Sequence, residues 1–555
     1  MTSSNSRACP FRRIDATGLL KLSEPFVLVA VLLTPSLWML TVIPPLWRDI
    51  DAYGEVTQFP GTGTFLLYGP LYCFAARVPL YFGYAIHCLR EGSPLPTFRF
   101  FGQPILSDAG VFALLVTQHA GLCCSGFYLI NSTTRLFWSR LLLAIAWMFN
   151  PLFYTLAHTI GSEALSMIVL VLMGTTGLRI VQSSRNVSRW FLFGILLYLS
   201  ILTRHVNAVL AALMPAAFLT YGFIVAPFTA SSACGRDRWV TTKRALQQAA
   251  VAVAVGLSCI VLANASVRIL CHAARIPYYS TLGLSFLYRL KFLATLRPEE
   301  RNHLLDQAAK HTSSPDVRNL ISLLRVSFPA RTSNWDVKAF NQKASALLFP
   351  GETDPSGVRY AVLLNHTAIT FLYPPNEIFL RRVAMDLNRS QQITIPDVVS
   401  FLFVTTRFYF SHREAMPQCA SLVTFRGKNA EQIFAIFKRH SYFRHPKNVS
   451  YHAFLVIWIV LLAAFLLTAK MRERDVTGIV SYASALIVIA ILMMLANCLL
   501  AVFQPRYTLP MWELTIVSLC ILFGGIMDTL LHQSGPLHSP ELNDQAKHSD
   551  HVQSS

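Results

Sequence analysis

One stretch of this sequence reads Phe454-Leu-Val-Ile-Trp-Ile-Val-Leu-Leu-Ala-Ala-Phe-Leu-Leu-Thr-Ala469, and it contains no charged residue. About 20 such residues in a helix cross the hydrocarbon core of a bilayer. Comparable runs recur along the chain, of which 54% is hydrophobic and 14% charged. The runs are continuous rather than alternating, which excludes a β-barrel. The sequence therefore predicts an all-α polytopic membrane protein.

Ten apolar segments are long enough to be considered as spans, and an even number places both termini on one side of the membrane. The segment at 189–203 is short for a span, and the alternative is one long kinked element around Arg204. The expected spans are 25–46, 106–130, 138–159, 163–182, 189–203, 205–226, 245–270, 451–471, 476–503 and 507–531.

The spans divide the chain into five parts. Residues 1–24 form a cytoplasmic N-terminus, and 25–270 form an N-terminal transmembrane catalytic module that includes an outer loop at 47–105. Residues 271–450 form a mostly helical extracytoplasmic insert, with helices expected near 298–306, 314–326, 336–348, 375–388, 396–410 and 429–439. Residues 451–531 form a C-terminal module of three spans, and the polar tail at 532–555 is expected to be disordered.

Lys and Arg in the short loops decide the orientation. They are far more frequent in the loops on the side of the N-terminus than in the opposite ones, which predicts that both termini are cytoplasmic. This orientation puts the loop after the first span, the turn His158-Thr-Ile-Gly-Ser-Glu163 and the insert in one outer compartment. The expected location is a bacterial inner (plasma) membrane, with the active site facing outward.

The outer loop at 47–105 is rich in Gly, Pro and aromatic residues. We expect amphipathic helices that lie in the outer interface of the membrane. The alternative is an eleventh span at 65–89, which would invert every later loop against the distribution of basic residues.

The formal net charge is +19, but the basic residues are spread over many loops and the insert rather than along one stripe. This pattern excludes a nucleic-acid partner and favours membrane lipids and phosphate groups.

Two carboxylates follow the first span, in Trp47-Arg-Asp-Ile-Asp-Ala-Tyr53. Because this chain has few charged residues, the presence of Asp49 and Asp51 at a membrane boundary indicates an active site there. Their alternative role is to solvate a helix end beside Arg48. Glu163 opens an apolar span, where a carboxylate is costly and is therefore a candidate functional residue, although capping that helix would also explain it.

These features occur in an order that resembles the GT-C-type membrane glycosyltransferases, such as the protein O-mannosyltransferases and the lipid A aminoarabinose transferase. The resemblance covers the N-terminal half and the last two spans. The motifs that carry it are Asp49 and Asp51, Tyr68-Gly-Pro-Leu-Tyr72, Ser162-Glu163, Leu202-Thr-Arg-His205 and Gln504-Pro-Arg-Tyr507. This chain departs from the family in two ways. It has Gly69-Pro70 where the family frequently has two prolines, and it contains a large insert.

The resemblance implies an inverting transfer of a sugar from a polyprenyl-phosphate donor to a lipid, glycan or protein acceptor. Asp49 or Asp51 would be the catalytic base, with Asp49 slightly favoured. Arginines suit the phosphate of the leaving group, although an arginine at a span end also often reaches lipid phosphates. The expected substrate-binding residues are Tyr53, His158, Glu163, Arg204, His205, Arg506 and Tyr507.

No metal ligands are assigned, and a divalent cation between Glu163 and one of the aspartates is left open. His119 is interpreted as an interhelical hydrogen-bonding residue and Glu513 is left unassigned. Two other functions fit a chain of this kind. One is a transporter or flippase of lipid-linked sugars, which needs no base, and the other is a polymerase or ligase of surface glycans.

Overall fold

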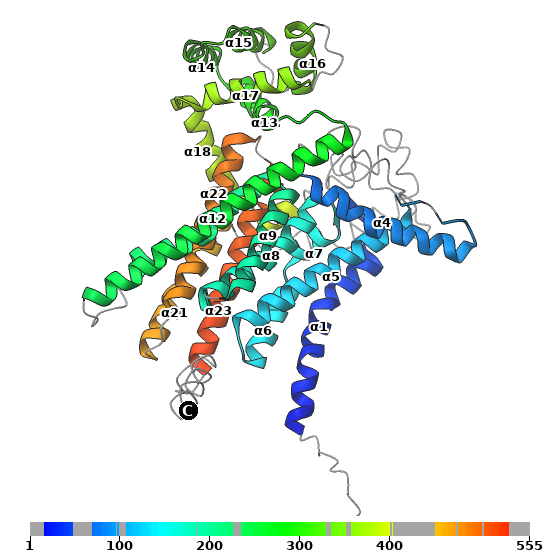
Figure 1. The fold of residues 1–555 in the computed structure, drawn as a ribbon, viewed down its shortest axis with the longest axis vertical. Coiled ribbons are helices and arrows are strands. Elements are labelled where there is room, and N and C mark those ends of the chain that lie inside the picture. Colours follow the sequence, from blue (N-terminus) through cyan, green and yellow to red (C-terminus); the bar gives the residue numbers. More distant parts are fainter. Residues whose placement is uncertain are drawn as a thin grey trace, which may run out of the picture.

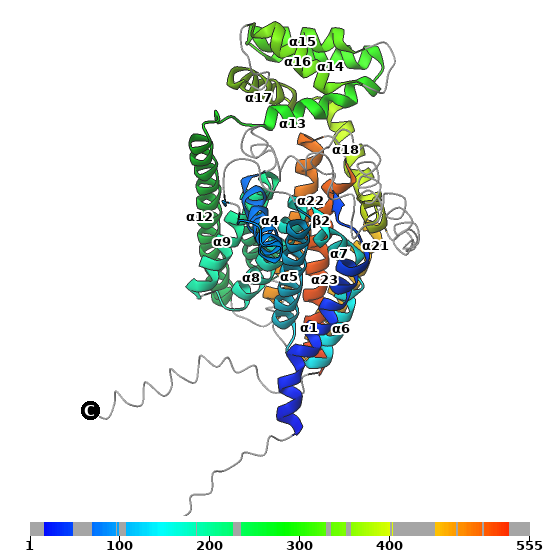
Figure 2. The same ribbon diagram turned by 90° about the vertical axis from the view of Figure 1, so that its right-hand side faces the viewer.

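The computed structural model describes residues 16–47, 69–95, 97–98, 107–184, 186–225, 235–328, 335–350, 357–399, 402, 450–472, 476–501 and 504–531. Long helices form a bundle, and a smaller group of helices covers one end of it (Figure 1). We call this end the upper end, and the end near the C-terminus the lower end. The view turned by 90° shows the same two layers (Figure 2).

The bundle is made by helices from both ends of the chain. Its N-terminal part contains α1 (Ala16–Val42), β1 (Leu46–Trp47), α4 (Pro70–Glu91), α5 (Asp108–Thr133), α6 (Phe137–Met148), α7 (Pro151–Ala157), β2 (Thr159–Ile160), α8 (Ser162–Gln182), α9 (Val187–Thr203), the 3₁₀-helix η1 (His205–Ala212), α10 (Leu213–Thr220), the π-helix η2 (Tyr221–Val225) and α12 (Gly235–Ala274). Its C-terminal part contains α21 (Tyr451–Met471), α22 (Thr477–Leu500), the 3₁₀-helix η8 (Pro505–Thr508) and α23 (Leu509–Leu531).

Eight helices among the described residues are long and apolar enough to cross a membrane, and the number is nine if the bent pair α6–α7 counts as one span. The chain is therefore an all-α protein of the multi-pass membrane type. All ten segments expected from the sequence are helical, but two differ from a simple span. The α9 helix has 17 residues, and α6 and α7 are bent by 65° relative to each other.

The bend between α6 and α7 has a local cause. The side chain of Asn150 accepts a hydrogen bond from the backbone N–H of Leu152, and Pro151 occupies the first turn of α7. An N-cap followed by proline starts a new helix instead of continuing the previous one. The expected segment 138–159 is thus two helices, and α7 ends directly before His158.

The helix α8 lies at the centre of the bundle, packed against α5, α9, α22 and α23. Most of its side chains are buried. The phenol of Tyr482 on α22 donates a hydrogen bond of 2.7 Å to the carbonyl of Gly174, and its ring lies against Gly177. Small residues on α8 therefore allow α22 to approach closely, as is common between membrane helices.

The described part of the outer loop contains the helix α4, and α4 is not among the eight candidate spans. It projects sideways from the upper half of the bundle (Figure 1). Exposed apolar side chains recur on one face of it, at Val78, Phe82, Ile86 and Leu89. Their spacing of three to four residues is that of an amphipathic helix, as expected for a helix in the membrane interface.

The insert is helical in the residues that the structure describes, and it forms the upper layer (Figure 2). Its elements are α13 (Leu282–Arg289), η3 (Leu290–Thr295), α14 (Pro298–His311), α15 (Pro315–Ser327), α16 (Val337–Leu348), α17 (Val358–Leu372) and α18 (Glu377–Gln392). The helices α13 and α18 pack against the upper end of α22. The sequence stretches expected at 396–410 and 429–439 lie wholly or largely outside the described residues.

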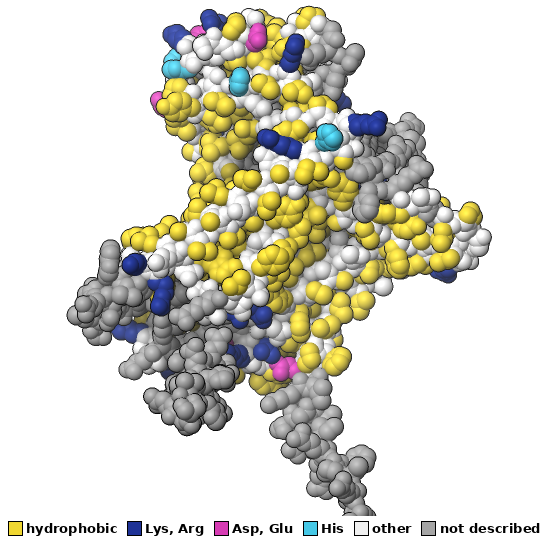
Figure 3. Space-filling view, in the orientation of Figure 1, with side chains coloured by type: hydrophobic (Ala, Val, Ile, Leu, Met, Phe, Trp, Pro, Cys, Tyr) yellow, Lys and Arg dark blue, Asp and Glu magenta, His cyan; other side chains and the backbone are white. Residues whose placement is uncertain are grey.

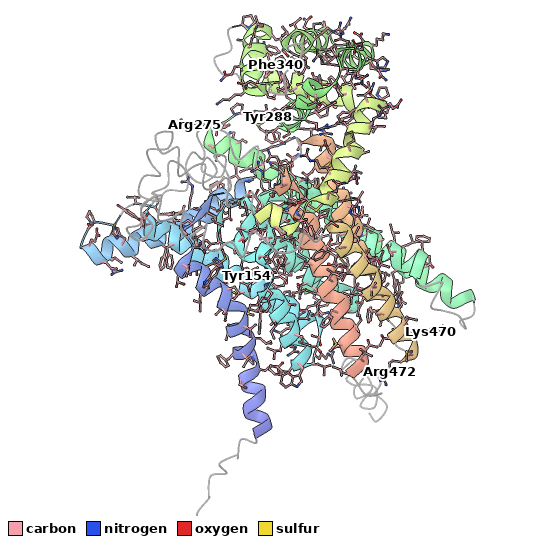
Figure 4. The ribbon with its side chains drawn as sticks, turned by 180° about the vertical axis from the view of Figure 1, so that it is seen from behind. Tyr154, Arg275, Tyr288, Phe340, Lys470 and Arg472 are labelled. Atoms are coloured by element: carbon pink, nitrogen blue, oxygen red, sulfur yellow. The ribbon has the colours of Figure 1, made fainter. Side chains whose placement is uncertain are left out.

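Basic side chains gather at the lower end of the bundle and again on the insert, while the face between them is mainly hydrophobic (Figure 3). Lys470 and Arg472 mark the lower end, and Arg275 lies at the upper end below the insert (Figure 4). Other basic residues of the lower end are Arg135, Arg140, Arg179, Arg189 and Arg244.

Candidate functional site at the upper end of the bundle

An ion pair joins two of the expected site residues at the upper end. Arg204 Nη1 lies 3.6 Å from Glu163 Oε1, and the Glu163 side chain is 2% exposed. Glu163 is in the first turn of α8, where the helix dipole favours an acid. Arg204 follows the last turn of α9 in extended conformation. The pair therefore connects the beginning of one helix to the end of the next.

The turn that holds Arg204 is fixed by an amide. The Nδ2 atom of Asn207 donates to Ser166 Oγ on α8 and to the carbonyl and Oγ of Ser200 on α9. The carbonyl of Arg204 accepts from the backbone N–H of Asn207. His205, another expected contact, is exposed at the start of η1. The sequence Leu202-Thr-Arg-His205 thus places Arg204 beside the buried acid and His205 at the surface.

A third charged residue, Glu513 on α23, interacts electrostatically with both Arg204 and Glu163. It is 2% exposed, and its Oε2 atom has no hydrogen-bond partner among the described residues. The upper end therefore holds two buried acids, and Arg204 acts on both of them.

Arg506 and Tyr507 lie in η8, which connects α22 to α23 at the same end. Arg506 is 4% exposed, and its Cζ atom lies 5.3 Å from the centre of the Tyr507 ring. The amide of Asn497 donates to the carbonyl of Tyr507 at 3.3 Å and so attaches η8 to α22. Arg506 is therefore buried in a short helical loop, unlike an arginine at a span end that extends to the lipid phosphates.

A short parallel strand pair ties the chain after α1 to the chain before Glu163. Leu46 is paired with Thr159 and Trp47 with Ile160, and the backbone N–H of Leu46 also donates to the carbonyl of His158. Strands of two residues leave no pattern that can be recognised in a sequence. The expected residues Asp49, Asp51 and Tyr53 follow Trp47 and lie outside the described residues.

The other end of the same loop is held close to Arg204. Gly69 has a φ of 94°, and a Cβ atom there would lie 2.5 Å from the carbonyl oxygen of Leu202 and 2.6 Å from that of Thr203. Only glycine combines this backbone conformation with such a close approach. Tyr72 accepts a hydrogen bond from the N–H of Gly161 and donates one to Gln118 Oε1. Within the motif Tyr68-Gly-Pro-Leu-Tyr72, Gly69 therefore packs against the segment before Arg204 and Tyr72 against the segment before Glu163.

A scan of protein-family models, a search of curated proteins and a search of solved structures each found no match to this chain.

His158 belongs to a chain of buried hydrogen bonds. Its Nε2 atom lies 2.9 Å from the carbonyl of Ile43, and its Nδ1 atom lies 3.1 Å from His119 Nε2. The Nδ1 atom of His119 lies 3.0 Å from Ser36 Oγ. Both ring nitrogens of His158 are thus occupied by protein partners. We expected His158 to bind substrate directly. Its hydrogen bonds indicate instead that it positions the backbone around Ile43.

Gln118, the neighbour of His119, completes this network. Its Nε2 atom donates to the carbonyls of Ala157 and Thr159, at 2.9 and 3.0 Å. One turn of α5 therefore holds the exit of α1, the strand β2 and the start of α4. Sequence reasoning assigned His119 to interhelical bonding but overlooked Gln118, although an amide within an apolar span was a visible sign that a partner exists.

Among the described residues, no group of three or more His, Cys, Asp and Glu side chains is arranged to hold a metal ion. Glu163 and Glu513 are two acids, and they share an arginine. The arrangement is chemically suited to bind a group that combines negative charge with hydrogen-bond donors. Arginines can hold the anionic part, and carboxylates can accept from hydroxyl groups.

Proposed function

We propose that this chain is an inverting membrane glycosyltransferase of the GT-C type. It transfers a sugar from a polyprenyl-phosphate donor to a lipid, glycan or protein acceptor, and membrane lipids surround it. The observation that carries the proposal is the buried Glu163–Arg204 pair at the end of the bundle to which both ends of the loop 48–68 are attached.

The attachment points explain why the loop aspartates are suitable as the base. Trp47 pairs with Ile160, three residues before Glu163, while Gly69 contacts the residues directly before Arg204. Asp49 and Asp51 follow Trp47 by two and four positions in the sequence, and each residue extends a chain by at most about 3.6 Å. This short separation from β1 supports the proposal that one of them acts near Glu163 and Arg204.

These residues perform three tasks in the proposed reaction. Asp49 or Asp51 takes the proton of the acceptor hydroxyl as its oxygen bonds to the anomeric carbon. The bond from that carbon to the phosphate oxygen breaks, and polyprenyl phosphate leaves. Arg204 and Arg506 stabilise the negative charge that grows on this phosphate, and Tyr507 adds a hydrogen bond. Glu163 orients Arg204 or the sugar.

The distribution of charge supports a reaction on the non-cytoplasmic side. Basic side chains gather at the lower end of the bundle (Figure 3), and basic residues of short loops are retained in the cytoplasm. The upper end, with Glu163, Arg204 and Arg506, would then face outward. We propose the inner (plasma) membrane of a bacterial-type cell as the location.

The test uses the purified full-length protein in proteoliposomes with a panel of polyprenyl phosphates that carry labelled sugars. The combined substitution Asp49→Asn and Asp51→Asn should abolish transfer of label to acceptor, and Asp306→Asn on the exposed surface of the insert should not. Unchanged transfer in the double variant would refute the assigned base. Movement of the lipid-linked sugar across the membrane without turnover would indicate a flippase. Competition only by pyrophosphate-linked oligosaccharides would indicate a polymerase or ligase.

A further inference from the structure

Glu513 is a buried carboxyl group that the reaction scheme above does not use. It lies on the second turn of α23, inside an apolar helix that is long enough to span the membrane. An ionisable group in such a place is costly and usually serves binding, transport or catalysis. Glu513 therefore requires an explanation of its own.

Among the described residues, the charges that act on Glu513 include one guanidinium and one further acid. The guanidinium of Arg204 forms an ion pair with Glu163 at 3.6 Å, and it also acts electrostatically on Glu513. The two acids repel each other across the same small volume. Arg204 thus acts on two acids, and buried charge clusters of this kind are weak evidence for a purely stabilising role.

One oxygen atom of Glu513 indicates what kind of partner this site binds. Its Oε2 has no hydrogen-bond partner among the described residues, although the side chain is 2% exposed. Buried polar atoms in proteins are almost always hydrogen-bonded. An ionised carboxyl group accepts hydrogen bonds and a protonated one can also donate, and a hydroxyl group can be the partner of either form. The phosphate of a lipid-linked sugar is better matched by the arginines Arg204 and Arg506 at the same end.

We propose that Glu513 binds a hydroxyl group of the glycosyl unit of the donor substrate, while Arg204 and Arg506 bind its phosphate. This inference rests on the proposed function and adds a sugar-recognition residue to it. Acids and arginines then bind different parts of one ligand. The hydroxyl groups of the sugar bind the acid, and the anionic oxygens of the phosphate bind the arginines. Glu513 also becomes a residue that is kept for binding at the expense of stability.

The test compares two Glu→Gln substitutions, which remove a charge with little change in shape. Glu513→Gln removes one of the two acids on which Arg204 acts. Glu24→Gln is the matched control at the lower end, where Glu24 Oε1 forms a one-to-one ion pair of 2.7 Å with Arg140. Binding is measured with polyprenyl phosphates that carry neutral hexoses and with polyprenyl phosphate that carries no sugar. Thermal unfolding of the ligand-free protein is measured in the same detergent.

Glu513→Gln is expected to raise the Kd of the sugar-bearing lipid at least tenfold, to change the Kd of the sugar-free lipid less than twofold, and to raise the Tm. Glu24→Gln is expected to lower the Tm and to leave both Kd values unchanged. A purely structural Glu513 would instead lower the Tm when substituted. An equal loss of affinity for both lipids, or no loss, would overturn the inference while wild-type transfer remains. If the wild-type protein neither binds nor transfers any of the sugar-bearing lipids, the proposed function itself fails.

Discussion

His119 Nε2 lies 3.1 Å from His158 Nδ1, and both imidazoles are buried. The carbonyl of Ile43 can only accept, so His158 Nε2 carries a proton and its Nδ1 accepts from His119. His119 Nδ1 then accepts from the hydroxyl of Ser36. This directional chain fixes both tautomers, and it attaches Ser36 in α1 and Ile43 directly after α1 to α5 and to the residue before β2.

Breaking the chain should loosen the upper end. His119→Phe removes the donor to His158 and the acceptor for Ser36 without leaving a large void, and each buried polar group left without a partner costs about 1–3 kcal/mol. We expect a lower Tm and faster hydrogen exchange in the peptides that contain 43–47 and 158–161. His87→Phe, on the exposed face of α4, is the control. Equal exchange in both variants would show that the chain does not position these segments.

The contact between Gly69 and α9 gives a second prediction. Gly69→Ala should reduce both stability and sugar transfer, because an added Cβ meets the carbonyl oxygens of Leu202 and Thr203 at a φ of 94°. Gly92, at the other end of α4, has a φ of 67° and open space around it. Gly92→Ala therefore bears only the backbone strain of about 1 kcal/mol. Thermal unfolding of the two variants separates strain from overlap, and similar Tm values would argue against the close contact.

The interaction of Arg204 with two acids gives a third prediction, which compares the cost of removing the arginine with the cost of removing one acid. Arg204→Met leaves Glu163 and Glu513 buried beside each other, and we expect a loss of about 3–5 kcal/mol in the free energy of unfolding. Glu163→Gln leaves Arg204 with Glu513 and should cost clearly less. Adding Glu513→Gln to Arg204→Met should recover part of the loss. Urea or thermal unfolding of the three variants checks the order, and an equal cost for Arg204→Met and Glu163→Gln would contradict the cluster.

The apolar spans were predictable because the bilayer requires about 20 apolar residues in a helix, whatever their partners are. The run Phe454–Ala469 is one example, and it lies within α21. The bend before α7 was missed although Asn150-Pro151 is a helix start, because continuous hydropathy on both sides outweighed it. In the insert, α14, α15, α16 and α18 were expected near their observed positions, whereas α17 was not.

The site was less accessible to sequence reasoning because its parts meet only in three dimensions. Glu163 and Arg204 could each be chosen from their position at a span end, but their pairing could not. Glu513 was noticed and left unassigned, because its neighbours lie on α8 and after α9, more than 300 residues away in the chain. The role of Tyr72 in joining α4 to Gly161 depends on a hydrogen bond that no motif specifies.

A fourth prediction concerns how the insert is attached to the bundle. Asp386 on α18 forms ion pairs with Arg289 on α13 and with Arg382 Nε at 3.3 Å, and the side chains of Asp386 and Arg289 are almost fully buried. Ser390, one turn later, contacts Cys498 on α22 at 3.8 Å. Asp386→Asn leaves two arginines without their shared counter-charge at this junction. We expect it to cost about 3–5 kcal/mol and to speed proteolysis of the insert.

The exposed pair of Asp306 and Arg325 in the same insert provides the control. Both side chains are about half exposed, so Asp306→Asn should change the free energy of unfolding by no more than about 1 kcal/mol. Limited proteolysis and thermal unfolding of the two variants distinguish the cases. If Asp386→Asn and Asp306→Asn behave alike, the buried pair does not hold the insert on α22. If Asp386→Asn also slows sugar transfer, the insert and α22 together position the loop that carries Arg506.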